Sequence, residues 1–508
     1  MRRFLLFFIL LVFVGIFCST SCRRKSTANV VPADTSNYPD SIASILVNKC
    51  AIAGCHNPAS YQNASGLELD TWAHLFNGNN FGTVVVAYST AYSSLLPEIN
   101  PDSTLGPTVD DPPHNTLLTN AQYVTLSNWI KKGSPDINGN IPFASNPDTR
   151  QKIYLTNQGC NLVAVIDAQS KQVMRYIPVG DANNQTPHDI TISSDGAYAY
   201  VPLYDGNMVQ KIDTRTDAIV STAYLNSYTP GGSYGQWSIV TLSPQDTALM
   251  VSGFLQTGSI ATINTAAMQL DPKKSIVPTT SGAGSIMPWP HGLANNPTFD
   301  TFFAALQYGN AVFKFGFAPR FWYKYVSVNG QPIVLTNSSD STNPNPHQIE
   351  MSPDNSRYFV SCQQTGMVSV IDAHTDSLIA QIPVGFYPQE MTVSTSKNYL
   401  LVACMEDANN PNYQMIGSVY VIDYNSLNVV ARIYGNFYEP HDLAVDEIDG
   451  LIFIASRNAS VGGIPSHHST VCGGNAGFYN VYNLNTLQPA DNKRYEVTRD
   501  AYAIAQRF

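Results

Sequence analysis

The feature that most constrains the fold is a phrase that recurs seven times between residues 152 and 508. Each copy opens with a Pro-His pair or a related pair, continues as an alternating strand, and in several copies reaches a Ser-Pro-Asp-like turn. Successive copies start between 42 residues (Pro346 to Pro388) and 60 residues (Pro440 to Asp500) apart. This spacing predicts the four-stranded blades of a β-propeller. The copies start at Pro187, Trp237, Pro290, Pro346, Pro388, Pro440 and Asp500.

A second phrase, of the form Val-x-Val-Ile-Asp, recurs between several of these copies and predicts the third strand of a blade. It occupies residues 163–167, 209–213, 368–372 and 419–423. Residues 378–385 predict a fourth strand. Together with the Ser-Pro-Asp-Gly-like turns, this phrase resembles the YVTN-type β-propeller family, which implies a seven-bladed all-β propeller over residues 151–508. Because the repeat starts mid-blade at Lys152 and ends in an inner-strand copy, the C-terminal strand is expected to complete the first blade.

The composition argues against nucleic-acid binding. The chain has 508 residues, only 13% of them charged, and a formal net charge of −10. No basic run occurs beyond the extreme N-terminus, whereas nucleic-acid binding requires clustered Lys and Arg. We therefore expect no nucleic-acid partner.

The N-terminus predicts export. Arg2 and Arg3 precede the apolar stretch 4–17, which is short for a membrane span and typical of a signal sequence. Small residues then lead to Cys22, and this arrangement resembles a bacterial lipobox, although Ser19 replaces the usual Leu. The resemblance implies a leader over residues 1–22, lipidation of Cys22, a polar linker over 23–40, and a periplasmic or cell-surface lipoprotein anchored to a membrane of a Gram-negative bacterium. The alternative is an unlipidated signal or signal anchor.

Two cysteines followed by a histidine indicate a haem site. Cys50 and Cys55 are separated by four residues, and His56 follows directly. Covalent haem attachment uses two thiols for the vinyl groups and an adjoining imidazole for the iron. The usual spacing is two residues, so a local disulfide beside an exposed histidine is the alternative.

The surroundings of this motif resemble the planctomycete-type cytochrome c domain. The resemblance covers about 90 residues and implies a small all-α domain (41–135) around one haem c, joined by a linker (136–150) to the propeller. It rests on the apolar residues 42–47, the sequence Gly-Leu-Glu-Leu-Asp at 66–70, residues 75–78, 84–86 and 93–96, the Pro112-Pro113 pair and a closing helix over 118–133.

The sequence differs from that family at the position of the sixth iron ligand. Relatives commonly place Met just before the Pro-Pro step, but this chain has Asp111 there and no Met between Met1 and Met174. We predict His114 as the sixth ligand and regard His74 as a weaker alternative. An open position is the third alternative. Histidine in place of Met is expected to lower the reduction potential.

Histidines also mark the start of several inner strands, at one rim of the predicted channel. Imidazole is the commonest ligand of copper, zinc and iron, so copper or another divalent metal could bind there. The fifth copy has Gln389 instead. The alternative is a structural role, with each ring bonded to a neighbouring blade. The candidates are His188, His291, His347 and His441 on the strands, and His467 and His468 in a loop of the last full blade.

Three functions remain open at this point. The first is an oxidoreductase or electron-transfer protein in which haem exchanges electrons with a redox partner protein or a small-molecule substrate at the histidine-bearing rim. The second is a non-catalytic propeller that binds a partner while the haem relays charge. The third is a lactonase-like hydrolase, which the resemblance to the propeller family allows. No nucleophile motif identifies a catalytic residue.

Overall fold

The computed structural model of the protein describes most of the chain. The described residues are 35–108, 118–182, 184–225, 235–276, 287–318, 321–325, 328–335, 343–411, 416–435, 437–458 and 477–507. No helix within these ranges has the length and apolar character needed to cross a membrane.

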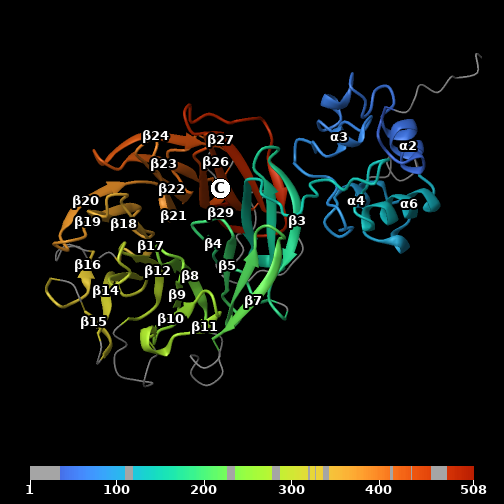
Figure 1. Ribbon diagram of the computed structural model, residues 1–508. Helices are drawn as coiled ribbons and strands as arrows, with labels where there is room; N and C mark the ends of the chain where they lie inside the picture. The colour runs from blue at the N-terminus through green and yellow to red at the C-terminus, as the bar shows by residue number, and fades with distance from the viewer. Residues whose placement is uncertain are drawn as a thin grey trace, which may run out of the picture.

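Seven antiparallel sheets form a ring, as Figure 1 shows. Neighbouring first strands contact one another around the ring, so they line its centre. These strands are β4 (Thr191–Ile192), β8 (Trp237–Leu242), β12 (Pro290–Asn295), β17 (Pro346–Met351), β21 (Phe386–Ser394), β25 (Tyr438–Asp446) and β29 (Ala501–Arg507). All seven predicted copies of the first phrase therefore contribute an inner strand, and the seven-bladed propeller is confirmed.

The other strands follow outward in each blade. The second strands are β5 (Tyr198–Leu203), β9 (Ala248–Gly253), β13 (Phe302–Leu306), β18 (Arg357–Cys362), β22 (Tyr399–Glu406), β26 (Leu451–Asn458) and β1 (Lys152–Asn157). The third strands are β6 (Met208–Asp213), β10 (Ser259–Asn264), β14 (Ala311–Ala318), β19 (Met367–Asp372), β23 (Ser418–Asp423), β27 (Gly477–Asn483) and β2 (Leu162–Asp167). The outer strands are β7 (Ala218–Tyr224), β11 (Gln269–Leu270), β15 (Phe321–Tyr325) with β16 (Ile333–Val334), β20 (Leu378–Pro383), β24 (Asn428–Tyr434), β28 (Tyr495–Val497) and β3 (Gln172–Pro178).

The last strand closes the ring. β29 pairs antiparallel with β1, with Lys152 opposite Arg507 and Leu155 opposite Ile504. The last blade is thus built from both ends of the propeller sequence, as predicted. This pairing covers a sheet edge that would otherwise be exposed.

Each blade packs against both of its neighbours through apolar side chains. Successive residues of a strand point to opposite faces, so Ile153 and Leu155 face one neighbouring blade while Tyr154 faces the other. Seven buried clusters result, one at each blade-to-blade contact. Burial on both faces explains why these strands are nearly continuously apolar.

The N-terminal unit, which we define as residues 35–108 and 118–135, packs around one apolar cluster. Its longest helix is α6, which begins with a capping box between Thr119 and Gln122 and buries Leu126 and Ile130. Its helices and turns are α2 (Asp40–Ile45), the π-helical η1 (Leu46–Cys50), η2 (Tyr61–Asn63), α3 (Trp72–Leu75), α4 (Leu95–Ile99), η3 (Ser103–Leu105) and α6 (Asn120–Lys131); η4 (Gln158–Cys160) and η7 (Pro272–Lys274) lie in the propeller.

The expectation of a separate all-α domain over residues 41–135 is wrong. Within the described part of this range, α2, α3 and α4 have only six, four and five residues, and most of the chain is turn or irregular structure. Helices this short depend on tertiary packing. Glycines with positive φ, among them Gly54, Gly66 and Gly78, break the segments between them. The molecule is therefore predominantly β.

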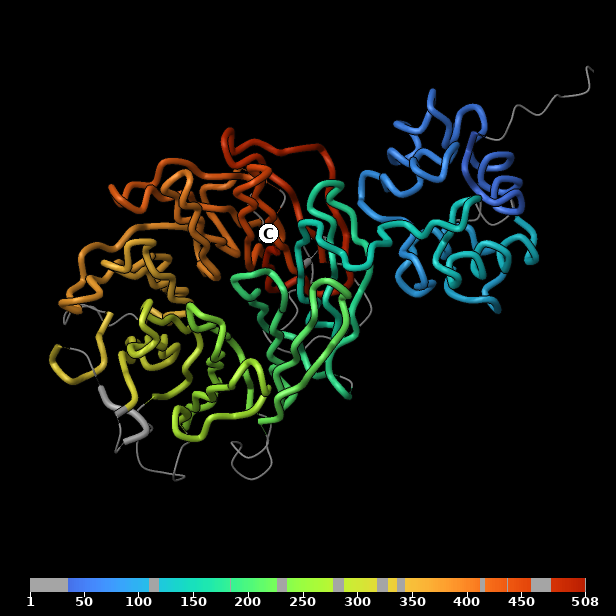
Figure 2. Tube along the Cα trace, viewed as in Figure 1, coloured from blue at the N-terminus to red at the C-terminus, as the bar shows by residue number. Residues whose placement is uncertain are grey.

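The N-terminal unit contacts the outer edges of two adjacent blades (Figure 2). The Thr83 hydroxyl accepts a hydrogen bond from the Val173 amide of β3 at 2.8 Å. The amides of Arg494 and Glu496, beside and within β28, donate to the carbonyls of Asn80 and Phe81 at 3.0 and 2.9 Å. Residues 80–83 therefore cover part of the blade edges.

Candidate functional site

The thiol–imidazole motif lies where the first helical segment of the N-terminal unit ends. Cys50 is the last residue of η1, and the backbone amide of His56 donates to its carbonyl at 3.1 Å. This turn brings the imidazole back toward the end of the helix. Both Cys50 and Cys55 are free thiols and half-buried, so the alternative of a disulfide between them is not formed in this structure.

The ring of His56 has a defined orientation. Its Nδ1 lies 2.9 Å from the carbonyl oxygen of Leu67. A carbonyl only accepts, so Nδ1 carries the proton and Nε2 keeps a lone pair. Metal-binding histidines usually make this contact through the nitrogen that is not bound to the metal.

Burial controls the ionisation of the first thiol. It raises the pKa of Cys50 to about 11, the negative charge of Cys55 adds to this effect, and Lys49 opposes it. Cys50 packs against the apolar cluster of the N-terminal unit, as Ala51, Trp72 and Phe76 also do. The motif therefore adjoins an apolar surface.

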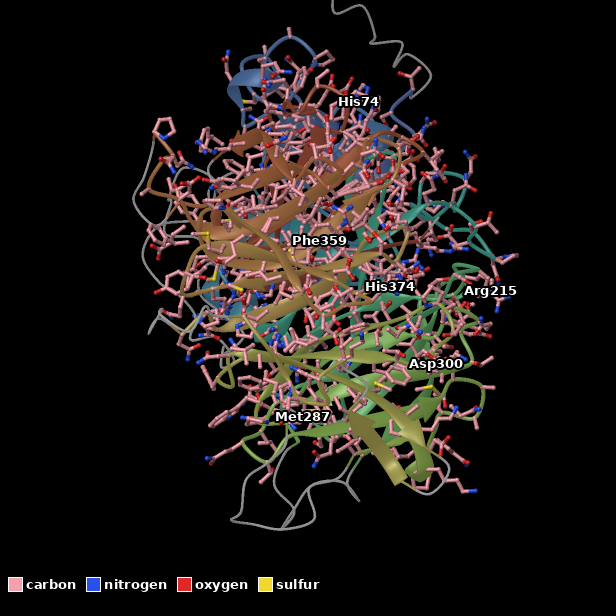
Figure 3. The ribbon with its side chains drawn as sticks, turned by 90° about the vertical axis from the view of Figure 1, so that its left-hand side faces the viewer. His74, Arg215, Met287, Asp300, Phe359 and His374 are labelled. Carbon is pink, nitrogen blue, oxygen red and sulfur yellow. The ribbon has the colours of Figure 1, made fainter. Side chains whose placement is uncertain are left out.

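The two sequence candidates for a sixth ligand have different outcomes. His114 lies outside the described residues, as does the lipidation candidate Cys22. His74 lies on α3, beside the blue N-terminal ribbon in Figure 3, with Nδ1 2.6 Å from Asp70 Oδ1 and 3.4 Å from Glu68 Oε2. His74 is therefore engaged with two carboxylates, and these three residues form a partly exposed cluster.

The second candidate site lies in the propeller channel, and a backbone bend that recurs in every blade positions its side chains. The residue just before each inner-strand pair has positive φ, even where it is a bulky Trp289 or Tyr387. In six blades the pairing of the inner strand also shifts register at this point. Such bulges redirect side chains. The seven residues with positive φ are Thr186, Gln236, Trp289, Asn345, Tyr387, Glu439 and Asp500.

All four predicted strand histidines are fully buried and gather around the channel. His188 Nε2 lies 3.3 Å from His291 Nε2, and the rings of His291 and His347 are 4.0 Å apart between centroids. His441 is 5.8 Å from His347 by the same measure. These contacts bring the four rings close together, whereas His467 and His468 lie outside the described residues.

Hydrogen bonds order part of this ring. The side-chain amide nitrogen of Gln158 lies 2.8 Å from His188 Nδ1, and His291 Nδ1 lies 3.1 Å from the carbonyl oxygen of His347. One set of neutral tautomers satisfies these contacts: Gln158 donates to His188, His188 to His291, and His291 to the carbonyl. Burial lowers the pKa of His291 to about 4, which keeps this ring neutral.

The sequence comparison of histidines missed Glu390. In the fifth blade Gln389 takes the histidine position, but the next residue places its carboxylate Oε1 3.4 Å from His347 Nδ1. Glu390 is 5% exposed. A search for carboxylates next to the histidine positions would have included it, although Asp189 and Asp442 occupy the same position and behave differently.

In other blades, the residue at the position of Glu390 forms a hydrogen bond to the neighbouring blade. Asp189 Oδ2 accepts from the amide of Val240, and Asp442 Oδ2 accepts from the amide of Ile504, both at 2.8 Å. Gln348 makes the corresponding bond to Met391. These bonds support the structural alternative for the inner-strand polar residues.

His441 also belongs to an aromatic and ionic group, which adjoins His188 through the ring of Tyr502. Its ring stacks on Tyr502 at 3.6 Å between centroids. Arg457 lies 5.2 Å from the same tyrosine ring and binds Asp500 through two hydrogen bonds of 2.6 and 3.0 Å. No sequence pattern indicated this pair, because Asp500 starts the seventh inner-strand phrase and Arg457 lies in no repeated phrase.

Among the described residues, the remaining histidine and the three remaining cysteines join neither site. His374 is exposed in the turn after β19 (Figure 3). Cys362 and Cys404 are buried free thiols, and Cys160 is disulfide-bonded.

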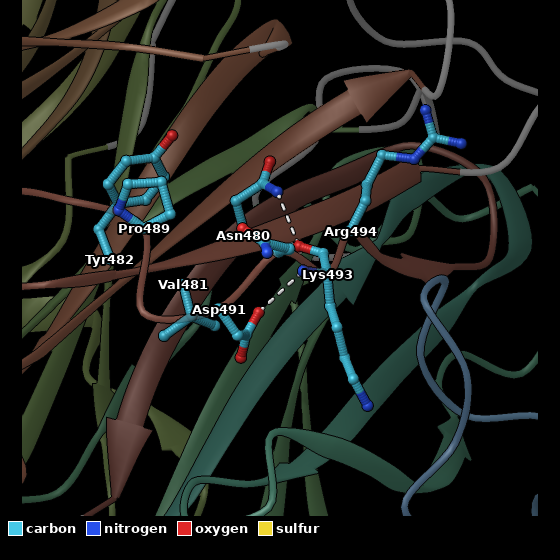
Figure 4. A pocket seen from close by; sticks show the side chains of 8 residues that line it. Asn480, Val481, Tyr482, Pro489, Asp491, Lys493 and Arg494 are labelled. Atoms are coloured by element: carbon cyan, nitrogen blue, oxygen red, sulfur yellow. Dashed lines mark hydrogen bonds between the residues drawn. The ribbon is translucent and has the colours of Figure 1, made fainter. Parts of the chain in front are cut away.

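Two surface cavities lie away from both groups. One, of about 250 Å³, is formed by β27 and the connection to β28; Figure 4 shows Lys493 at its border, whose ammonium donates to the carbonyl of Asn77. The other, of about 450 Å³, lies between Tyr88, the segment 141–146 and Arg175. Neither is lined by a predicted site residue.

Comparison with known proteins supports the fold. No family model matches the chain. A stretch of 131 residues is 28% identical to Antigen Lp49 of Leptospira interrogans, and covers 23% of this chain and 26% of that protein. The match therefore spans only about a quarter of that relative's length.

Two solved structures resemble most of the chain. A protein of unknown function from Desulfotomaculum acetoxidans has a TM-score of 0.52 at 13% identity, covering 71% of this chain and 99% of its own. A Bacteroides fragilis protein provisionally named as a 6-phosphogluconolactonase has a TM-score of 0.50 at 12% identity, with 72% and 99% coverage. At these identities the likeness concerns the fold alone. The seven-bladed β-propeller is the classification that these comparisons and the structure share.

Proposed function

We propose that the protein is an exported electron-transfer protein that carries one haem c on Cys50, Cys55 and His56. The carrying observation is the contact between His56 Nδ1 and the carbonyl of Leu67, which leaves Nε2 available to an iron ion. When bound, haem supplies a metal centre that accepts and donates single electrons.

The residues present suit this group. The two thiols are free, as thioether formation requires, and both flank the turn that ends in His56. Trp72 and Phe76 pack against the same apolar cluster as Cys50, and haem needs a hydrophobic surface of this kind. The protein's part would be to hold the group, orient its proximal imidazole and limit the access of water.

The propeller would act as a rigid platform for the N-terminal unit. This unit is bonded to two blade edges through residues 80–83. A redox partner protein or a small-molecule substrate would exchange electrons with the haem. The proposed leader would deliver the protein to the periplasm or cell surface, with Cys22 as a lipid anchor, and His114 remains the predicted sixth ligand.

The test is pyridine haemochrome spectroscopy on exported, matured protein. The wild type is expected to retain a haem c spectrum after denaturation and acid–acetone extraction, while Cys50→Ala/Cys55→Ala is expected to lose it. Cys362→Ala removes a buried thiol of the propeller and is the matched control. Haem that stays attached without both motif cysteines, or a colourless mature protein with these sulfurs joined, would overturn the proposal.

A further inference from the structure

We propose a divalent transition-metal site in the propeller channel, formed by His291, His347 and Glu390. The three residues come from the inner strands β12, β17 and β21 of consecutive blades. All are buried, and one ligand atom of each lies within 4.8 Å of the others. The metal site does not depend on haem attachment, because it lies in the propeller.

The distances suit coordination. In a tetrahedral site with bonds of about 2.0–2.1 Å, neighbouring ligand atoms are about 3.3–3.4 Å apart. His347 Nδ1 and Glu390 Oε1 are 3.4 Å apart. His188 Nε2 lies 3.3 Å from His291 Nε2, so His188 is a candidate fourth ligand beside His291.

The orientation of His291 also suits a ligand. Its Nδ1 donates to the carbonyl of His347, so the other nitrogen, Nε2, has the lone pair. This is the arrangement in which a backbone carbonyl fixes the tautomer of a metal-binding ring. The neighbouring Gln158 has a side-chain oxygen without a hydrogen bond among the described residues. If this amide were rotated by about 180°, its oxygen would accept a hydrogen bond from His188 Nδ1. His188 Nε2 would then carry a lone pair that could bind a metal ion.

Glu390 differs from its counterparts in a way that a structural role does not explain. Asp189 and Asp442 each accept an amide of the next blade. The amide of the next blade that corresponds to these for Glu390 is that of Leu443, and it donates its hydrogen bond to Asp442 Oδ1 instead. Glu390 Oε1 makes no hydrogen bond among the described residues and is directed at His347.

The chemistry of the three side chains suits a cation. Glu390 is buried, and its carboxylate Oε1 lies 3.4 Å from His347 Nδ1. Burying a carboxylate costs several kcal/mol unless a positive charge or hydrogen bonds compensate it. A divalent ion bound to Glu390 would supply that compensation. Two imidazoles and one carboxylate form a donor set that zinc and ferrous iron share.

The experiment measures Zn²⁺ binding to the full chain after chelation and dialysis, by calorimetry and elemental analysis, with Co²⁺ absorption as a spectroscopic readout. We expect one Zn²⁺ per chain besides any haem iron, and a loss of affinity of at least a hundredfold in Glu390→Gln and His347→Gln. Glu390→Gln is nearly isosteric, and thermal unfolding monitors its fold.

Three further variants locate the ion. His374→Gln, on the outer surface, is the control and is expected to bind as the wild type does. His441→Gln is expected to lose less than tenfold, because His441 is not one of the three residues whose ligand atoms cluster. Asp70→Asn tests the surface cluster with His74. A wild type that binds no zinc at micromolar concentration, unchanged affinity in Glu390→Gln and His347→Gln, or equal losses in His441→Gln or Asp70→Asn would overturn the proposed site.

Discussion

The N-terminal unit and the propeller achieve stability in different ways. The propeller has seven apolar clusters, one at each blade contact, and every blade is supported from two sides. The N-terminal unit has a single cluster, and its short helices and turns are held by that cluster and by bonds to the blade edges. Regular repeats can therefore fix a fold without help, whereas the N-terminal unit relies on one core and on its neighbours.

The same contrast applies to the two candidate sites. The channel residues are buried, and each follows a residue with positive φ at the start of its inner strand, a feature that all seven blades share. The thiol–imidazole motif lies in a half-buried turn between short elements. We expect the channel geometry to depend little on ligand, and the N-terminal turn to gain order when haem is attached.

The largest expected effect comes from removing β29. Deleting residues 501–508 takes the inner strand from the last blade, leaves the edge of β1 unpaired and opens two apolar clusters. The propeller is expected to lose cooperative thermal unfolding and to aggregate. Circular dichroism and calorimetry measure this, and removal of residue 508 alone is the control. A truncated chain with a wild-type melting transition would show that ring closure is dispensable.

The repeat pattern explains why the propeller was predictable from sequence. Each inner strand carries its own copy of the phrase, so an error in identifying one copy would not change the predicted architecture. The closure of the ring by the C-terminal strand followed from where the first and last copies lie. The bend that aims the histidines was not predictable, because positive φ occurs at residues as different as Thr186, Trp289 and Asp500. Turn preference alone does not point to Trp or Thr at such positions.

The N-terminal unit and Glu390 show where sequence reasoning failed. Residues 42–47 and 118–133 predicted helices, and α2 and α6 lie there, but the chain between them is mainly irregular. Glu390 follows a position where histidine is replaced by Gln389, so the fifth blade seemed to contribute nothing to the channel. The role of Glu390 depends on which carboxylate accepts the hydrogen bond from the Leu443 amide. That choice is decided by packing between blades.

An intermediate effect is expected from Leu126→Ala in the core of the N-terminal unit. Leu126 is 0% exposed on α6, and truncation of such a side chain costs about 2–5 kcal/mol. Because this unit has one core, we expect its own unfolding transition to shift while the propeller transition stays in place. Chemical denaturation followed by separate probes of the two regions measures this. Val124→Ala, at an exposed position of the same helix, is the control, and a joint shift of both transitions would show that the two regions unfold as one.

The smallest expected effect concerns the junction of the two regions. The Thr83 hydroxyl donates to Gln172 Oε1 at 2.9 Å and accepts from the Val173 amide at 2.8 Å. Thr83→Val keeps the shape but leaves these groups without that partner, which costs about 1 kcal/mol for a typical hydrogen bond. We expect this loss in the transition of the N-terminal unit only, because the seven propeller clusters are unaffected. Thr125→Val, whose hydroxyl bonds only within α6, is the matched control; if both variants lower stability equally, the N-terminal unit does not draw stability from the blade edge, and its single core alone maintains it.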